Sequence, residues 1–189
     1  MIWRVRRVLT GHDSEGRSTF IADGEAPNVK EMLPGLALTD LWETKGAPAS
    51  NAGTADAADR PVHLEPPKNG TILRIVEFPP DSGWRGGADG AAAFKSIGAG
   101  HAQDRASSDP MMHITSTVDY IIVLKGEIYA ILETGEKLLR AGDILVQRGT
   151  NHSWSVRTSE PCIIAAVLVS AKPVASKKKP SKKSRKKKK

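Results

Sequence analysis

The second half of the chain is a series of short apolar segments separated by turn residues. From Met111 onward the segments are MMHITSTVDYIIVLKG, EIYAILET, EKLLRAGD, ILVQRG, HSWSVRT and PCIIAAVLVS. Glycine, often beside lysine, threonine, aspartate or asparagine, stands between most of them, as at Gly126, Gly142 and Gly149. Short strands at regular spacing with turn residues between them predict an all-β sandwich or barrel.

The first half of the chain has fewer strand signals and two long polar stretches. WRVRRVLT alternates apolar and charged residues as a half-buried strand does, and STFIADG and LALTDLWET indicate further short strands. TILRIVEF predicts a strand that ends at Pro79. Residues 45–70 and 81–110 are rich in small, polar and turn-forming residues, so we expect surface loops, with one or two helical turns in ADGAAAFKSI.

Polar side chains recur at every second position just before the chain becomes apolar. His113, Thr115, Thr117 and Asp119 are two residues apart in series, so in an extended strand all four face the same side. His152 follows a tight turn and opens a later strand. We therefore expect the polar groups to gather at one end of a barrel wall, where the mouth of a pocket would lie.

These residues resemble the first motif of the cupin superfamily, G-x5-H-x-H-x3-E-x6-G. His113 matches the first histidine and Gly126 the last glycine. Asp119 stands at the glutamate position, Thr115 at the second histidine and Ser107 at the opening glycine.

A second stretch resembles the second cupin motif, G-x5-P-x-G-x2-H-x3-N, whose first gap varies. Gly142, Gly149 and His152 match it, while Gln147 replaces the proline and Val156 the asparagine. The resemblance covers about residues 70–171. It implies a small single-domain, type-2-like cupin: a double-stranded β-helix, or jelly-roll barrel, at 70–171, preceded by an N-terminal β arm and loop at 1–69 and followed by a Lys-rich tail at 172–189.

Typical metal-binding cupins take two histidines and a carboxylate from the first motif and one histidine from the second. The resemblance thus implies a divalent metal at His113, Asp119 and His152, which are also the expected catalytic residues. Two imidazoles and one carboxylate suit Fe(II), and Mn, Ni or Zn are alternatives. In the competing interpretation the pocket holds no metal, and the same polar side chains bond to one another or to an organic ligand.

Further residues are expected to shape the substrate pocket: Arg74, Thr115, Thr117, Gln147 and Trp154. Arg74 lies between apolar neighbours in TILRIVEF, and a charge in a buried strand requires a partner. That partner would be a substrate carboxylate or a protein acid such as Glu77 or Asp119. Trp154 has the same strand parity as His152 and would lie beside it, although core packing explains an aromatic equally well.

Charge and cysteine content narrow the functional classes. The 189 residues carry a net charge of +7, but residues 172–189 hold eleven lysines and arginines and no acid. Subtracting those eleven charges leaves −4 for residues 1–171, so the basic character belongs to the tail. We expect the tail from Lys177 to be disordered and to contact polyanions non-specifically at most. The single cysteine, Cys162, lies in an apolar segment and excludes an intrachain disulfide.

Together these observations predict a cytoplasmic protein without a membrane span. The resemblance implies a small-molecule enzyme of the oxygenase, decarboxylase or dehydratase type that acts on a carboxylate- or carbonyl-bearing metabolite. A protein that binds a small ligand without catalysis is the alternative, because cupins host many unrelated activities. We also expect a homodimer in which the N-terminal arm covers an edge strand.

Overall fold

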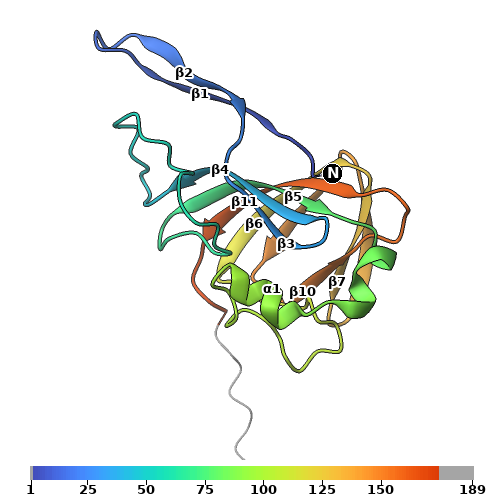
Figure 1. Cartoon of the computed structure of the whole chain (residues 1–189). Coiled ribbons are helices and arrows are strands. Elements are labelled where there is room, and N and C mark those ends of the chain that lie inside the picture. Colours follow the sequence, from blue (N-terminus) through green and yellow to red (C-terminus); the bar gives the residue numbers. More distant parts are fainter. Residues whose placement is uncertain (1, 175–189) are drawn as a thin grey trace, which may run out of the picture.

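The computed structural model describes residues 2–174 and consists mainly of antiparallel β-strands (Figure 1). The tail from Lys177, for which disorder and polyanion contact were predicted, lies outside the described residues. Within the described residues, no helix is long and apolar enough to cross a membrane.

A six-stranded sheet forms one wall of the molecule, with strand order β3-β4-β5-β11-β6-β9. Its strands are β3 Val29–Leu33, β4 Leu36–Thr44, β5 Thr71–Phe78, β6 Thr117–Lys125, β9 Ile144–Arg148 and β11 Cys162–Ser170. The central strand β11 pairs with β5 on one side and with β6 on the other. Segments from the two halves of the sequence therefore share one sheet, and β4 pairs with β5 across the predicted boundary at residue 69.

A three-stranded sheet faces the first one, with strand order β10-β7-β8. Its strands are β7 Glu127–Leu132, β8 Gly135–Arg140 and β10 His152–Ser155. The side chains between the two sheets form one hydrophobic cluster, to which Val76, Ile128 and Ile164 contribute. The barrel predicted from the spacing of the strand segments is confirmed.

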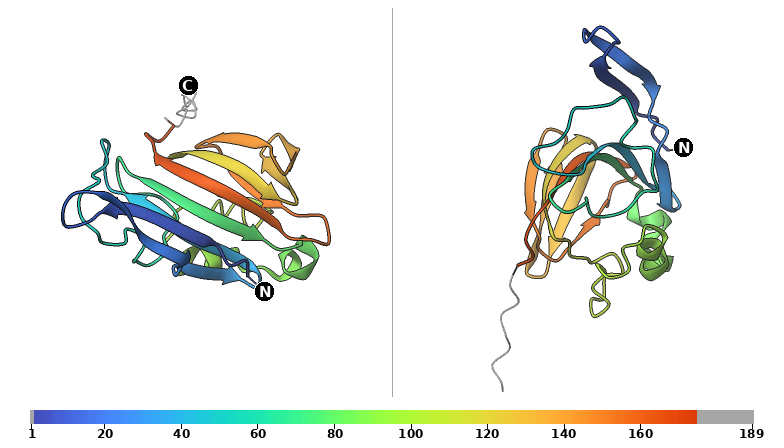
Figure 2. Two further views of the ribbon diagram at one scale, coloured as in Figure 1. Left: turned by 90° about the horizontal axis from the view of Figure 1, so that it is seen from above. Right: turned by 90° about the vertical axis from the view of Figure 1, so that its left-hand side faces the viewer.

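The first two strands form a hairpin that stands away from this body (Figures 1 and 2). β1 Arg6–His12 pairs with β2 Ser18–Glu25, and every residue of β2 is exposed. The other strands of the predicted N-terminal arm join the six-stranded sheet instead, and one of them, β3, has no counterpart among the segments expected from the sequence.

The long segment between β5 and β6 covers one end of the barrel (Figure 1). It holds two 3-10 turns, η1 Asp81–Gly83 and η2 Arg85–Gly87, and the helix α1 Gly90–Ser96. The helix confirms the expected helical turns, and the Asp89 side chain caps it by accepting a hydrogen bond from the Ala92 amide. Burial of Phe94 fixes the helix against the barrel mouth.

Candidate functional site

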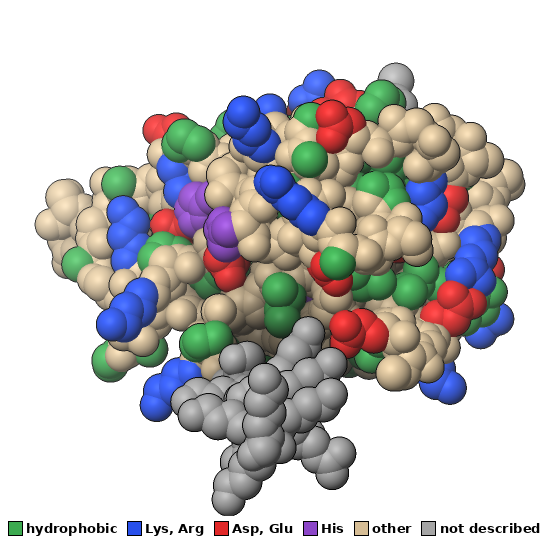
Figure 3. Space-filling model, turned by 90° about the horizontal axis from the view of Figure 1, so that it is seen from below, with side chains coloured by type: hydrophobic (Ala, Val, Ile, Leu, Met, Phe, Trp, Pro, Cys, Tyr) green, Lys and Arg blue, Asp and Glu red, His purple; other side chains and the backbone are tan. Residues whose placement is uncertain are grey.

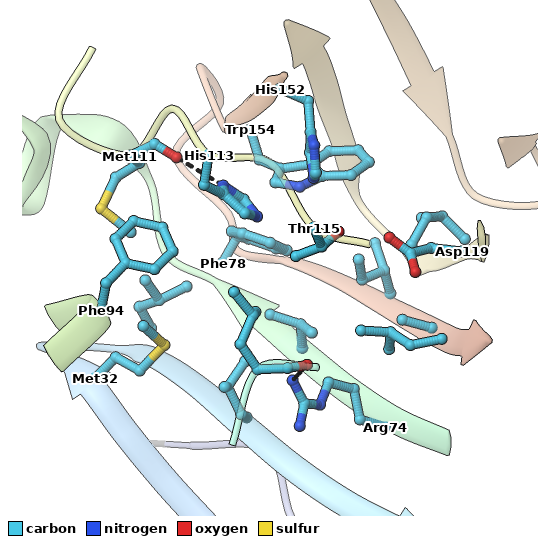
Figure 4. Close-up of a pocket in the computed structure, with 18 of the residues that line it drawn as sticks. Met32, Arg74, Phe78, Phe94, Met111, His113, Thr115, Asp119, His152 and Trp154 are labelled. Carbon is cyan, nitrogen blue, oxygen red and sulfur yellow. Dashed lines mark hydrogen bonds between the residues drawn. The ribbon is translucent and has the colours of Figure 1, made fainter. Parts of the chain in front are cut away.

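A cavity of about 100 Å³ lies inside the barrel (Figure 4). Most of its walls are apolar, formed by side chains such as Leu38, Val76, Phe78, Phe94 and Trp154. The polar residues that line it are Arg74, His113, Thr115, Asp119 and His152. A concave, mainly apolar space with a few polar groups on its wall is the kind of place where small molecules bind.

The two predicted histidines lie side by side in this cavity. The backbones of His113 and His152 form a bridge in which each amide donates to the other carbonyl over 2.9 Å. As a result the ring centroids are only 4.2 Å apart. β6 begins at Thr117 and not at Met111 as predicted, so this bridge, and not a continuous strand, positions His113.

In both histidines Nδ1 faces a backbone carbonyl, which leaves Nε2 for the cavity. Nδ1 of His113 lies 2.9 Å from the Met111 carbonyl, and Nδ1 of His152 lies 2.9 Å from the Thr150 carbonyl. A carbonyl oxygen only accepts, so Nδ1 of His113 carries the hydrogen and donates it. Nδ1 of His152 also lies 3.1 Å from the Gln147 amide nitrogen, but the two hydrogens of that amide have the Thr150 carbonyl and hydroxyl as acceptors, so the hydrogen is assigned to Nδ1 here as well. Each neutral ring therefore keeps an unprotonated Nε2, which can accept a hydrogen bond or take up a proton.

The surroundings keep both imidazoles neutral. Burial lowers the pKa of His113, and the hydrogen bond to Met111 opposes this only in part. Burial, together with the neighbouring His113, lowers the pKa of His152 to about 3. Neither ring is therefore charged near neutral pH.

Aromatic side chains from two elements pack around the histidine pair. Phe94 of α1 lies 5.0 Å from the His113 ring, and Trp154 of β10 meets the His152 ring edge-on at 5.7 Å. Trp154 thus lies beside His152, as its strand parity predicted. Gln147 is buried behind His152, where its amide donates to the Thr150 carbonyl over 3.0 Å and fixes the turn; it does not line the cavity.

Thr115, Thr117 and Asp119 are buried near the histidines, and Thr115 and Asp119 line the cavity, whereas the predicted pocket residue Thr117 does not. The hydroxyls of Thr115 and Thr117 are 2.7 Å apart. Asp119 is only 5% exposed, and its Oδ1 atom has no hydrogen-bond partner in the described residues. Burial raises the pKa of Asp119 to about 6, although the Thr117 hydroxyl and the charge of Arg74 oppose the shift.

Arg74 has a partner that the sequence analysis did not identify. Its guanidinium binds both carboxylate oxygens of Asp40, at 2.7 and 3.1 Å, and both side chains are buried. The predicted protein partners Glu77 and Asp119 are wrong, because the register of β4 and β5 places Asp40 directly opposite Arg74. One signal was present: Asp40 is an acid within the apolar segment LALTDLWET, as Arg74 is a lone base in TILRIVEF.

A short segment from the long loop closes the cavity on another side, which the sequence analysis also missed. Leu64 lines the cavity, and Arg74 donates to the carbonyls of His63 and Leu64 over 2.7 and 3.3 Å. On the other side of this segment, Glu65 accepts from the Ser116 amide over 2.8 Å and contacts His101 at 2.9 Å. Histidine side chains reach the surface beside acidic ones on the underside of the molecule (Figure 3).

The arrangement of these residues does not supply a three-ligand metal centre. Within residues 2–174, no group of three or more His, Cys, Asp or Glu side chains is placed to hold a metal ion. His113 and His152 would offer two nitrogens, but Asp119 lies farther along the wall, beyond Thr115 (Figure 4). The predicted metal site at His113, Asp119 and His152 thus has no support from the geometry of the described residues.

The remaining predicted feature, Cys162, is buried in the core and unpaired. Burial raises the pKa of its thiol to about 12, which makes it a poor nucleophile. Cys162 therefore belongs to the packing of β11 and not to the site.

The sequence of the chain is similar to those of several curated fungal proteins. No family model matches the chain. The oryzines biosynthesis cluster protein J of Aspergillus oryzae is 30% identical over 158 residues, which cover 80% of this chain and 74% of that protein. The cupin-domain-containing oxidoreductase virC of Hypocrea virens is 28% identical over 181 residues, covering 90% and 78%.

Among solved structures, the cupin domain of Schizosaccharomyces pombe Cnp3 aligns over 89% of both chains with 11% identity and a TM-score of 0.46. Two facing antiparallel sheets, the paired motif histidines and the curated relatives agree: the chain belongs to the cupin superfamily.

Proposed function

We propose that the chain is a small-molecule enzyme that uses Asp119 as its general acid and base, with His113 and His152 as hydrogen-bond acceptors beside it. The observation that carries the proposal is the buried Oδ1 of Asp119, which lines the cavity without a partner. Buried polar atoms normally have partners, so an orphaned one in a cavity indicates a group reserved for a ligand. A pKa of about 6 also lies close to neutral pH, where proton transfer by a carboxyl group is most effective.

In this proposal the bound molecule lies with its apolar part against the aromatic side chains and its polar end against the wall at Asp119. The carboxylate takes up a proton from the molecule and returns one before release, so the enzyme ends each turnover in its starting state. The neutral histidines align the polar end through Nε2. Curated relatives named as cupin-domain-containing oxidoreductases favour an enzyme, and proton transfer is one part of such a reaction.

Turnover of small aromatic and aliphatic hydroxy and carbonyl compounds, followed by mass spectrometry, tests this proposal. We expect Asp119→Asn to abolish product formation while it leaves ligand binding measurable. Asp23→Asn, a change on the exposed hairpin, is the matched control and should behave as wild type. Full turnover by Asp119→Asn would reject the role of Asp119.

The mainly apolar cavity also favours the second candidate, a protein that binds a small ligand without converting it. Its apolar walls suit retention of a ligand, which catalysis alone does not require. A ligand that co-purifies unchanged and stays unchanged in wild type and Asp119→Asn would support this alternative.

Metal dependence, predicted from the family resemblance, is tested separately by the metal content of the purified protein. One Fe, Mn, Ni or Zn ion per chain that is lost in His113→Ala would support the predicted metal centre. We expect far less than one ion per chain, because the described residues provide only two neighbouring nitrogen ligands.

We also propose that the chain forms a homodimer through the outer face of the six-stranded sheet. Tyr120 of β6 lies opposite Val146 of β9, and both are about half exposed, while Ile144 is 67% exposed. Exposed apolar side chains that adjoin each other are typical of interfaces. A two-fold contact would pair this face with itself, and the projecting β1–β2 hairpin would reach the second copy (Figure 1).

The predicted cytoplasmic location and the contacts of the tail remain predictions. On the underside of the molecule, positive and negative side chains are interspersed (Figure 3). A nucleic-acid role would therefore depend on the tail, and removal of residues 172–189 should abolish any salt-dependent binding to DNA.

A further inference from the structure

The polar wall of the cavity offers more hydrogen-bond acceptors than donors. His113 and His152 each present an unprotonated Nε2, since each Nδ1 hydrogen is donated to a backbone carbonyl. Asp119 adds two carboxylate oxygens, of which Oδ1 has no partner in the described part of the chain. These three residues face the same space (Figure 4).

The two threonine hydroxyls beside them add at most one free hydrogen. The oxygens of Thr115 and Thr117 lie 2.7 Å apart, so the hydrogen of one hydroxyl is used in this contact, and either hydroxyl can be the donor. Thr115 lines the cavity, and one such hydrogen is fewer than the acceptors that the imidazoles and Asp119 present.

The cation at the cavity is already neutralised. Of the five N–H groups of Arg74, three bind Asp40 and the carbonyl of His63, and a fourth binds the carbonyl of Leu64. Asp40, which is fully buried, binds both Arg74 and Arg60, and Glu43 also binds Arg60, so two carboxylates balance the two guanidinium charges. Within residues 2–174, the side-chain donors left at the cavity are the fifth N–H of Arg74, the indole N–H of Trp154 and one threonine hydroxyl hydrogen.

We propose that the site binds an uncharged, mainly apolar molecule whose polar end is a hydrogen-bond donor such as a phenol or an alcohol, and that it rejects carboxylates. This inference rests on the proposed function in one respect, since both place the ligand against Asp119. A hydroxyl would donate to an imidazole Nε2 or to Asp119, which satisfies acceptors that are otherwise buried without partners. A carboxylate brings only acceptors and a second negative charge next to Asp119.

The inference narrows the substrate class expected from the family resemblance, which included carboxylate-bearing metabolites. It also gives the apolar walls a role in selectivity. A buried site whose acceptors match a hydrogen-bond donor on the ligand binds a ligand of the same shape without that donor much more weakly. The reason is that the acceptors of the site are then left unpaired.

Three probes of similar size test this selectivity: 4-ethylphenol, 4-ethylanisole and 4-ethylbenzoate. Their affinities for the full chain are measured by calorimetry at pH 8, where Asp119, with a pKa of about 6, is ionised. We expect 4-ethylphenol to bind at least about tenfold more tightly than the other two, because the anisole has no donor and the benzoate is repelled.

Asp119→Asn provides the second arm, because it removes the charge and adds an amide donor to the same wall. We expect this variant to gain affinity for 4-ethylbenzoate by about tenfold and to lose part of its preference for 4-ethylphenol. Asp23→Asn on the exposed hairpin should leave all three affinities unchanged. The comparison assigns the selectivity to Asp119 and not to the overall charge of the protein.

The inference would be overturned if wild type bound 4-ethylbenzoate as tightly as 4-ethylphenol or more tightly. Equal affinities for 4-ethylphenol and 4-ethylanisole, or no binding of any probe, would overturn it too. These outcomes are separate from failure of the proposed function, since binding is measured without turnover. A chain that selects the phenol but whose turnover survives Asp119→Asn would keep the ligand class and lose the catalytic role.

Discussion

At the scale of single residues, the proposed chemistry depends on a carboxyl group whose Oδ1 atom has no hydrogen-bond partner in the described residues. Asp119 is buried in β6 and lines the same cavity as two neutral imidazoles, and its pKa rises to about 6 mainly because burial disfavours the charged form. A group that is costly to bury and is left unpaired contributes little to the packing of the barrel. Its position on the cavity wall instead suits proton exchange with a bound molecule.

Replacement of Asp119 by asparagine should lower the turnover number by about 100-fold or more, because general acid–base groups typically contribute at least that factor. Asparagine has nearly the same shape, so the cavity should keep its form. Turnover of wild type, Asp119→Asn and the hairpin control Asp23→Asn with one substrate measures the effect. A loss of less than about threefold in Asp119→Asn would contradict the role.

The same replacement should stabilise the fold at high pH. A carboxyl group whose pKa is raised from 3.8 to about 6 destabilises the folded state progressively from pH 4 to pH 6, and fully above pH 6. Two pKa units correspond to about 3 kcal/mol, an upper estimate for the gain in Asp119→Asn at pH 8. The gain should shrink to well under about 1 kcal/mol near pH 4, where the wild-type group is protonated in the folded state and only about half ionised in the unfolded state. Urea unfolding at both pH values measures this difference, and a gain independent of pH would contradict it.

At the scale of secondary-structure elements, the site depends on the joints between the two sheets. Gly126 connects β6 of the six-stranded sheet to β7 of the three-stranded sheet with φ of +75°, and an added Cβ would lie 2.7 Å from the Pro161 carbonyl oxygen. Residues other than glycine are strained at such a φ. The glycine therefore permits the close approach of the two chain segments at this corner.

Gly126→Ala should lower the free energy of unfolding by more than about 1 kcal/mol, because the added methyl group meets a backbone oxygen and the φ is unfavourable. Gly135→Ala is the matched control, since nothing lies within 4 Å of its added Cβ. Thermal or urea denaturation of the two variants gives the comparison. Equal stability of both would mean that the corner relaxes without cost.

Arg74→Met should destabilise the fold by about 3 kcal/mol, because it leaves the buried carboxylate of Asp40 without its main partner. The matched control is Arg6→Met, which breaks an exposed ion pair with Asp23 on the hairpin and should change stability little. Chemical denaturation of both variants separates a structural role of Arg74 from a role in ligand binding. Unchanged stability in Arg74→Met would indicate that its charge serves the ligand instead.

The elements also show what the sequence could predict. Alternation and turn residues were sufficient to predict most of the strands, because these signals are local; Thr115, Thr117 and Asp119 are all buried, but only Thr115 and Asp119 line the cavity. The partner of Arg74 depends on the register of β4 against β5, and the closure of the cavity by Leu64 depends on where a long loop folds back. The bridge between His113 and His152 is likewise a long-range contact, so their 4.2 Å separation could not be read from motif spacing.

At the scale of the whole molecule, one apolar sheet face and one projecting hairpin remain uncovered in the described residues. Tyr120, Val146 and Ile144 adjoin one another on this face, and Phe20 of the hairpin is strongly exposed. The apolar area would cost less if a second copy covered it. The hairpin would then be ordered against the partner, which gives the N-terminal segment a function.

Light scattering after size-exclusion chromatography should give twice the mass of the chain for wild type and one chain mass for Ile144→Lys. The reason is that a charge at the centre of an apolar interface is not compensated. Lys137→Glu, an exposed change on β8 of the other sheet, is the control and should stay dimeric. A monomeric wild type at high protein concentration would contradict the dimer.

The most direct test of the account is a pH titration of the Asp119 carboxyl carbon by NMR, with and without 4-ethylphenol. The account predicts a midpoint near pH 6 in the free protein and a clear shift of this resonance when the phenol binds. A midpoint near the ordinary value of 3.8, with no response to the phenol, would show that Asp119 neither is tuned by the cavity nor faces the ligand.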